Sequence, residues 1–206
     1  MIDKTIVDML SSISLAMFSK NFFGIYHGAL SAKIDYKSFV INTRDAIFDK
    51  IDSKSLCELS AENKDYRWKI ASIESHVHAS IYDNIHEAKY IAFALPHYTT
   101  AMTFNNKEIV LQDYFGKTTF GTVEIYDPGD FSTWYDRNEK EITDYFLKTR
   151  NHIMVIKGVG VYVYDRDILQ LVKKIAILEN SCKLLSIKNS FWIYFATKPR
   201  KMGFLS

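Results

Sequence analysis

Three ionisable side chains at four-residue spacing are the most chemically suggestive feature of the sequence. Glu74, His78 and Tyr82 follow one another in this way within residues 70–82. Residues four apart share one face of a helix, so a carboxyl, an imidazole and a phenol would form one polar stripe. If the stripe faces a cleft, burial would raise the pKa of Glu74 and allow acid/base chemistry near neutral pH. The alternative is a solvated glutamate at a helix start, which the helix dipole favours.

The stripe requires a helix over residues 74–86, which we predict together with a buried strand over 90–95 that Pro96 ends. Apolar periodicity predicts further helices over residues 2–19 and 168–185. A helix is also expected to start after the proline, over residues 97–104, and the charged segment 131–149 is predicted to be helical. Further strands are predicted over residues 22–26, 30–35, 38–42, 119–126 and 153–164, the last interrupted by two glycines. Residues 47–60 are expected to be irregular or to hold a short helix. This alternation predicts one α/β domain, residues 1–206, with helices covering a sheet.

The net charge, the apolar segments and the cysteines indicate which kinds of binding partner to expect. A net charge of +2 on 206 residues favours neither nucleic acid nor anionic lipid as a partner. No stretch reaches the roughly 18 apolar residues of a membrane span, and no signal-peptide core follows Met1. Cys57 and Cys182 lack metal-binding spacing and are expected to be reduced packing residues. We therefore expect a cytoplasmic protein without a membrane partner, and a solvated basic tail at residues 198–201.

Four segments carry a resemblance to a known family: residues 27–31, residues 72–82, residues 123–130, and residues 160–164 with the helix that ends at 176–179. Their residue types and order resemble the class II aldolase and adducin head-domain family over about residues 5–186, which leaves 187–206 as a C-terminal extension. The resemblance implies an α/β/α three-layer fold with a central mixed, mostly antiparallel sheet. The family contains zinc-dependent sugar-phosphate aldolases and epimerases, and also adducin, a cytoskeletal protein without enzymatic activity.

The resemblance also shows what this chain lacks. In the active relatives a His-x-His pair on one strand and a third histidine on a late strand hold zinc. The matching positions here are Phe93, Leu95 and Val159, which cannot bind a metal. No cofactor is therefore expected, and zinc or another divalent metal would have to use His97 and His78 as substitutes. His76 and His78 would point about 200° apart on a helix, so they could not share an ion.

The resemblance implies that Glu74 matches the family's acid/base residue and that a ligand phosphate would lie near Gly28, Ser31, Arg44 and Ser72. The guanidinium of Arg44 could hold an anion, or it could form a salt bridge to Asp45 or Asp49. Lys157 is a candidate Schiff-base lysine, or an edge lysine with a snorkelling stem.

Retro-aldol cleavage develops an enediolate that the metal stabilises by several kcal/mol, so Glu74 alone would not restore it. We therefore predict a divergent family member without metal-dependent aldolase activity. It would act as a ligand-binding or structural oligomer, a homo-tetramer or dimer, with a small sugar or phosphate ligand. The alternative is a sugar-phosphate aldolase or epimerase-type lyase that uses relocated metal ligands or metal-independent acid/base chemistry through Glu74.

Overall fold

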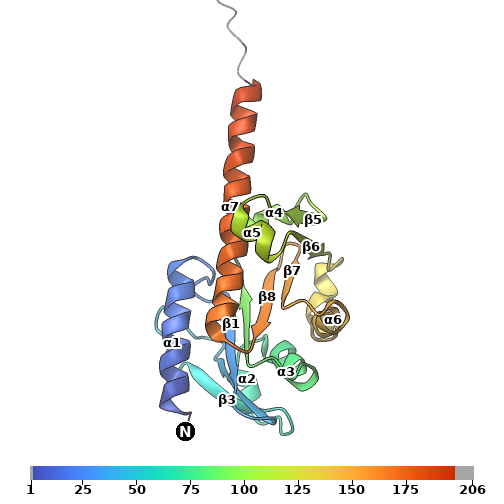
Figure 1. The fold of residues 1–206 in the computed structure, drawn as a ribbon. Coiled ribbons are helices and arrows are strands. Elements are labelled where there is room, and N and C mark those ends of the chain that lie inside the picture. The colour runs from blue at the N-terminus through green and yellow to red at the C-terminus, as the bar shows by residue number, and fades with distance from the viewer. Residues whose placement is uncertain (1, 198–206) are drawn as a thin grey trace, which may run out of the picture.

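An eight-stranded sheet forms the centre of the protein, which a computed structural model describes over residues 2–197 (Figure 1). The strands are β1 (Ala29–Lys33), β2 (Ser38–Asn42), β3 (Leu56–Ser60), β4 (Tyr90–Ala94), β5 (Glu108–Val110), β6 (Thr122–Tyr126), β7 (Ile153–Ile156) and β8 (Gly160–Asp165). Their order across the sheet is β3-β2-β1-β4-β8-β7-β6-β5. Neighbours pair antiparallel except β6 and β7, which are parallel.

Helices cover both faces of the sheet, so the fold has three layers (Figure 1). Helices α1 (Lys4–Ser19) and α7 (Ile168–Thr197) cover one face. Helices α2 (Arg67–Ile70), α3 (Ser75–Asn84) and α6 (Trp134–Thr149) cover the other. Helices α4 (His97–Met102) and α5 (Tyr114–Thr119) pack against α7, and the 3-10 turn η1 (Phe131–Thr133) precedes α6. The mixed, mostly antiparallel sheet between helical layers confirms the predicted fold class.

Successive side chains along each strand point to opposite faces of the sheet, and this alternation creates two apolar cores. Leu30, Ala92 and Val163 point toward α1 and α7, whereas their neighbours Ile91 and Tyr162 point toward α3 and α6. Helix α7 has 30 residues and is therefore about 45 Å long. Its C-terminal part extends past the sheet (Figure 1), and within the described residues no helix combines the length and hydropathy that crossing a membrane requires.

Several sequence predictions need correction. Residues 22–26 form bends instead of a strand, and the segment expected to be irregular contains strand β3. The predicted strand 153–164 is two antiparallel strands, because Gly158 and Gly160 adopt φ of 68° and 142° and turn the chain. Strand β5 and helix α5 were not predicted, and α7 continues twelve residues beyond its expected end at 185. The predicted tail at 198–201 lies outside the described residues.

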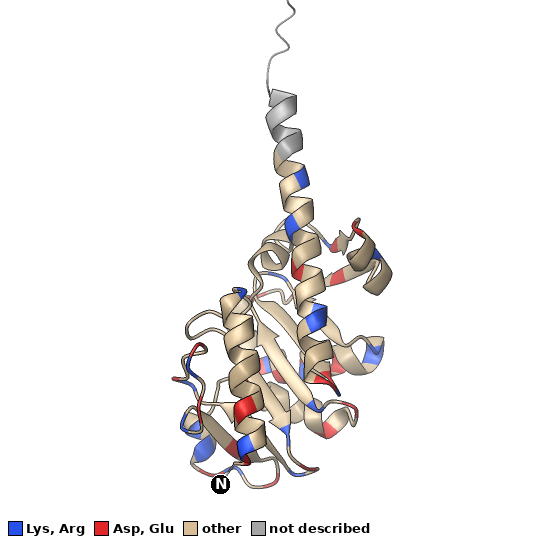
Figure 2. Ribbon diagram, turned by 60° about the vertical axis from the view of Figure 1, so that its left-hand side comes forward, with Lys and Arg blue, Asp and Glu red and all other residues tan. Residues whose placement is uncertain are grey.

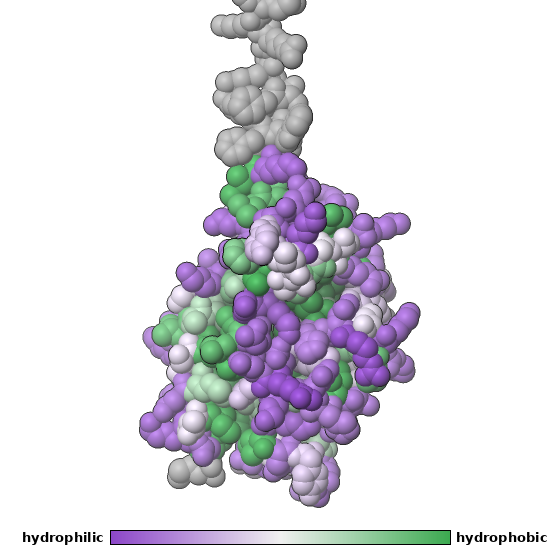
Figure 3. Space-filling view, viewed as in Figure 1, coloured by the Kyte–Doolittle hydropathy of each residue, from purple (hydrophilic) through white to green (hydrophobic). Residues whose placement is uncertain are grey.

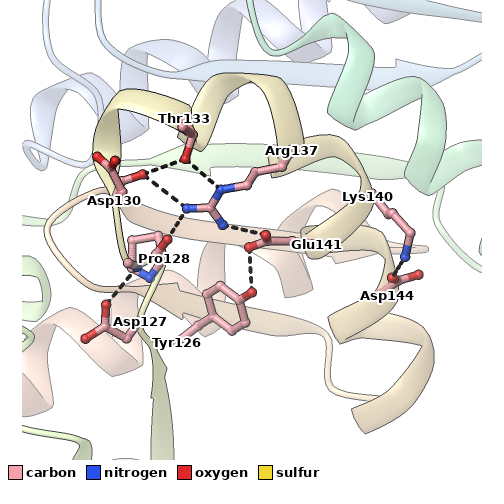
Figure 4. Close-up of polar contacts among 10 residues, drawn as sticks. Tyr126, Asp127, Pro128, Asp130, Thr133, Arg137, Lys140, Glu141 and Asp144 are labelled. Carbon is pink, nitrogen blue, oxygen red and sulfur yellow. Dashed lines mark hydrogen bonds and ion pairs between the residues drawn. The ribbon is translucent and has the colours of Figure 1, made fainter.

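Arg137 organises the turn between β6 and α6 (Figure 4). Its guanidinium donates to the main-chain oxygens of Pro128 and Asp130 and forms an ion pair with Glu141. The hydroxyl of Tyr126 donates to the other oxygen of Glu141 at 2.6 Å. The Arg137 side chain therefore bonds two main-chain carbonyls of the turn and positions the carboxylate that accepts the hydrogen bond from Tyr126.

We expect Arg137→Ala to lower the free energy of unfolding by about 1–3 kcal/mol, because it leaves partly buried carbonyls and Glu141 without a donor. Lys140→Ala is the matched control, since Lys140 also forms an ion pair four residues along α6, with Asp144, but that pair is exposed. Its loss should change stability by less than about 1 kcal/mol. Urea unfolding of both variants measures the difference, and equal effects would contradict the role given to Arg137.

Candidate functional site

The start of helix α3 is fixed to the end of strand β2. The Ser72 N–H donates to the Asn42 carbonyl at 2.9 Å, and the Ser75 hydroxyl donates to the Ser72 carbonyl at 2.6 Å. The Glu74 N–H donates to the Ser72 hydroxyl oxygen at 3.3 Å. Glu74 is the N-cap residue of α3, but its side chain makes no capping hydrogen bond. Its carboxyl group is therefore free to point toward the sheet.

The carboxyl group of Glu74 meets a tyrosine from the sheet. Glu74 is only 9% exposed, and the hydroxyl of Tyr162 on β8, which is fully buried, donates to its Oε2 atom. Burial raises the pKa of Glu74 above its ordinary value, and the hydrogen bond from Tyr162 opposes part of that effect. The same burial, together with the nearby carboxylate, raises the pKa of Tyr162. The surroundings of Glu74 and Tyr162 therefore disfavour the charged form of both side chains.

Phe93 completes this contact from the neighbouring strand β4. Its ring stacks on Tyr162 with a centroid distance of 4.8 Å and an interplanar angle of 28°. The space for the ring depends on Gly160, where an added Cβ would lie 2.5 Å from the Ala94 carbonyl and 3.0 Å from the Phe93 ring. Phe93 therefore occupies the region between α3, β4 and β8 in which Glu74 ends.

The other two residues of the predicted stripe, His78 and Tyr82, belong to a buried chain of hydrogen bonds. His78 and Tyr82 lie on the same face of α3 as Glu74 and are almost completely buried. The Ser31 hydroxyl lies 2.7 Å from His78 Nδ1 and 2.7 Å from the Tyr82 hydroxyl, which in turn lies 3.4 Å from the Lys89 carbonyl. Burial lowers the pKa of His78 to about 3, so its imidazole is neutral. This chain links α3 to the sheet beneath it.

A cavity of about 160 Å³ opens beside Glu74, and we refer to it as the Glu74 cavity. It is lined by Tyr26, His27, Gly28, Asn42, Arg44, Ser72, Ile73, Glu74 and Phe93. Four residues predicted for the site, Gly28, Arg44, Ser72 and Glu74, line it together. Ser31, His78 and Tyr82 do not; they lie behind it, inside the fold.

Two of the lining residues have clear local reasons for their positions. Gly28 has φ of 139°, and a Cβ there would lie 2.5 Å from the Phe23 ring, so only glycine fits. Arg44 is exposed, and no carboxylate within residues 2–197 lies at ion-pair distance from it, so the predicted alternative of a salt bridge to Asp45 or Asp49 is not found. Its guanidinium is therefore available at the rim of the cavity.

Sequence reasoning missed Tyr26, His27 and Asn42 as lining residues. Asn42 ends strand β2, where its Oδ1 atom accepts from the Leu30 N–H at 2.9 Å and its amide donates to the Thr43 carbonyl at 3.0 Å. The predicted hairpin would have placed Asn42 opposite the residues after Gly28, which is a usable signal. Tyr26 and His27 are exposed loop residues and give no such signal.

The donors present do not fit a tetrahedral metal centre. Within the described residues no three His, Cys, Asp or Glu side chains come together in an arrangement that could hold a metal ion. Phe93, Leu95 and Val159, the positions that we expected to match the family's ligands, carry no metal-binding atoms, and the carboxyl group of Glu74 accepts a hydrogen bond from Tyr162. The substitute ligands are apart: His97 lines a groove beside α1 and α7, whereas His78 is enclosed under α3 on the opposite face.

Lys157, Cys57 and Cys182 lie outside the Glu74 cavity. Lys157 follows β7, an interior strand of the sheet, and its ammonium group pairs with Asp127 at 2.9 Å on the surface, so it is not enclosed as a Schiff-base lysine would be. Cys57 and Cys182 are free and buried, and burial raises the pKa of the Cys57 thiol to about 11 and that of Cys182 to about 12. Both thiols are therefore protonated packing groups.

The layered fold agrees with comparisons to known proteins. The family described as "Class II Aldolase and Adducin N-terminal domain" matches residues 9–186, and the chain belongs to that family. No curated protein sequence matches the chain.

Solved structures show the same fold at low sequence identity. An L-fuculose-1-phosphate aldolase from Thermus thermophilus superposes with a TM-score of 0.77 and 16% identity, over 96% of this chain and 99% of that one. YgbL from Klebsiella pneumoniae gives a TM-score of 0.72 and 17% identity, over 100% and 96%. A sugar-phosphate aldolase from Thermotoga maritima gives 0.67 and 11%, over 91% and 96%.

The raised pKa of Glu74 has a consequence for stability. An acid whose pKa is higher in the folded state binds more protons when folded, so stability falls as pH rises above the unfolded value near 4.5. Glu74→Gln keeps an acceptor for Tyr162 and removes the titration. We expect this variant to gain stability relative to the wild type by up to about 1.4 kcal/mol for each pH unit above that value, until the carboxyl group ionises in the folded state.

Urea unfolding of both proteins between about pH 4 and about pH 8 measures this difference. A stability difference that does not change across this range would contradict a raised pKa of Glu74 in the folded protein. Tyr162→Phe is the complementary variant, because it removes the donor and should destabilise the protein most where Glu74 is ionised in the folded state.

Proposed function

We propose that this chain is a family member without metal-dependent aldolase activity that binds a small anionic, sugar-like ligand in the Glu74 cavity. The observation that carries the proposal is the contact between Glu74, Tyr162 and Phe93. A carboxyl group that accepts from a buried phenol, beside a stacked aromatic ring, is arranged as a hydrogen-bonding group, and within the described residues too few His, Cys, Asp or Glu side chains gather around it to hold a metal ion.

The rim of the cavity supports an anionic ligand. Arg44 presents a guanidinium fork, which suits bidentate contact with a phosphate or carboxylate. The hydroxyl of Ser72 accepts from the Glu74 N–H and keeps its own proton for a ligand oxygen. The cavity of about 160 Å³ has room for part of a small sugar phosphate but is below the usual size of a drug-like ligand pocket.

Binding should appear in a thermal-shift screen of sugar phosphates, free sugars and inorganic phosphate, performed with and without added zinc. A ligand at 100 times its dissociation constant should stabilise the wild type by about 2.7 kcal/mol. Arg44→Gln should remove the response to phosphorylated compounds and preserve any response to free sugars. Arg150→Gln, an exposed arginine at the end of α6, serves as the control. An equal response in the wild type and Arg44→Gln would contradict the anion site.

A metal measurement tests the other half of the proposal. We expect wild-type protein that has been incubated with zinc and dialysed to retain much less than one equivalent by elemental analysis. Retention of one equivalent in the wild type, and its loss in Glu74→Gln, would establish a metal centre at this site and overturn the proposal.

A second candidate function is metal-independent acid/base chemistry through Glu74. The raised pKa of this carboxyl and its place on the cavity wall favour it. A ligand found in the screen that is also consumed by the wild type and not by Glu74→Gln would establish this alternative.

We also propose that the protein self-associates as a dimer or tetramer. Large apolar side chains remain exposed at the β7–β8 turn, where the rings of Phe104 and Phe131 lie near Gly158, and on α5, where Phe115 is 66% exposed. Light scattering coupled to size-exclusion chromatography measures the mass directly, and a monomer of 23.9 kDa across the accessible concentration range would contradict this proposal.

A further inference from the structure

A second and larger hollow lies on the opposite face of the sheet from α3. It is a groove of about 640 Å³ between the C-terminal end of α1, the start of α4 and the middle of α7. Figure 1 shows α1 and α7 side by side on this face of the sheet. The volume falls within the range of about 300–1,000 Å³ that small-molecule sites occupy. We call it the α1/α7 groove.

The walls of the α1/α7 groove are mostly apolar. Ala16 on α1, Phe22 in the following bend, and Val172 and Ala176 on α7 supply this surface. The two alanines leave room between the helices, and Phe22, which is only 6% exposed, forms part of the floor. Figure 3, which has the same view as Figure 1, shows hydrophobic residues exposed over α1 and at the point where α7 extends beyond the rest of the protein. An occupant with an apolar or aromatic body would lose contact with water here.

Two lysines and a histidine surround this apolar wall. Lys20 ends α1, Lys183 lies on α7, and His97 opens α4; all three line the groove and are exposed. Figure 2 shows basic positions at the C-terminal end of α1 and along α7. Lys183 lies with its Nζ atom 5.6 Å from the centre of the Tyr98 ring. Within residues 2–197 neither Lys20 nor Lys183 forms an ion pair.

One acidic side chain lines the groove, and its carboxylate is already occupied. Both oxygens of Glu179, which is 9% exposed, accept hydrogen bonds from the start of α4: from the Tyr98 N–H at 2.9 Å, and from the Thr99 N–H and hydroxyl at 2.8 and 2.7 Å. These three donors satisfy both oxygens of Glu179, and its single charge offsets only one of the two lysines that line the groove. The groove therefore has an apolar wall and an unbalanced positive rim.

We propose that the α1/α7 groove binds an organic anion with an aromatic or apolar body, of the aryl carboxylate, sulfonate or phosphate type. The body lies against Phe22, Val172 and Ala176, and the acidic group lies between Lys20 and Lys183. Asn21 and Asn180, which also line the groove, supply amide donors at its edge. The site is separate from the Glu74 cavity and does not depend on the function proposed there.

Anilinonaphthalene sulfonate is a suitable probe because it combines an aromatic body with one negative charge and fluoresces in apolar surroundings. Phenylnaphthylamine, which has nearly the same body without the charge, is the matched neutral probe. We expect saturable binding of about one molecule of either probe per chain. The double variant Lys20→Gln/Lys183→Gln should weaken the anionic probe about tenfold and change the neutral probe less than about twofold.

Two variants locate the probe. Ala176→Trp fills the groove from α7, and Asn180→Trp fills it from an exposed position at the edge; each should weaken both probes by at least about tenfold. Lys173→Gln, an exposed lysine on α7 that does not line the groove, is the control and should bind as the wild type does. Thermal unfolding identifies any variant that does not fold.

Unchanged binding of both probes in a folded Asn180→Trp protein would place the probe elsewhere and overturn the proposal. Equal weakening of the anionic and neutral probes in the double lysine variant would overturn its preference for anions. Absence of saturable binding of either probe to the wild type would also overturn it.

Discussion

The hydrogen bond between Tyr162 and Glu74 is the contact on which the candidate site depends. A carboxyl group that is 9% exposed requires a partner, because burial without a hydrogen bond costs several kcal/mol. Tyr162 supplies that partner from β8, and Phe93 on β4 fixes the position of the phenol by stacking on its ring. The absence of a side chain at Gly160 makes room for Phe93. Helix α3 and two strands are thus joined at one carboxyl group.

This arrangement decides which chemistry the site can support. A carboxylate that accepts from a phenol and lies beside an aromatic ring resembles a ligand-anchoring group more than a group that binds a cation. The chain of His78, Ser31 and Tyr82 closes the space behind it, and the low pKa of His78 keeps that space uncharged. Arg44 and Ser72 also line the Glu74 cavity, and they are the groups that we propose contact an anion.

The sequence was most informative where one local signal decided the structure. Pro96 ends β4, apolar periodicity identifies α1 and the first part of α7, and the spacing of Glu74, His78 and Tyr82 places them on one helical face. It failed where strand composition concealed a turn: β-branched and aromatic residues continue through residues 153–164, and two glycines of positive φ divide them.

Only part of the candidate site could be predicted, because its other contacts join segments that are far apart in the sequence. Glu74 and Tyr162 are 88 residues apart, and their contact depends on the pairing of β4 with β8, which no local pattern encodes. The family resemblance located Phe93 but not its stacking partner. Tyr26 and His27 line the cavity because of the path of an irregular loop, and no sequence pattern predicts that path.

The mutual support of Phe93, Tyr162 and Gly160 also means that these positions cannot be changed independently. A histidine at position 93 alone would put a polar ring against the buried face of Tyr162, and a change at position 162 alone would leave Glu74 without its donor. Substitutions here are therefore expected to be non-additive, because the cost of one change depends on which side chain occupies the neighbouring position.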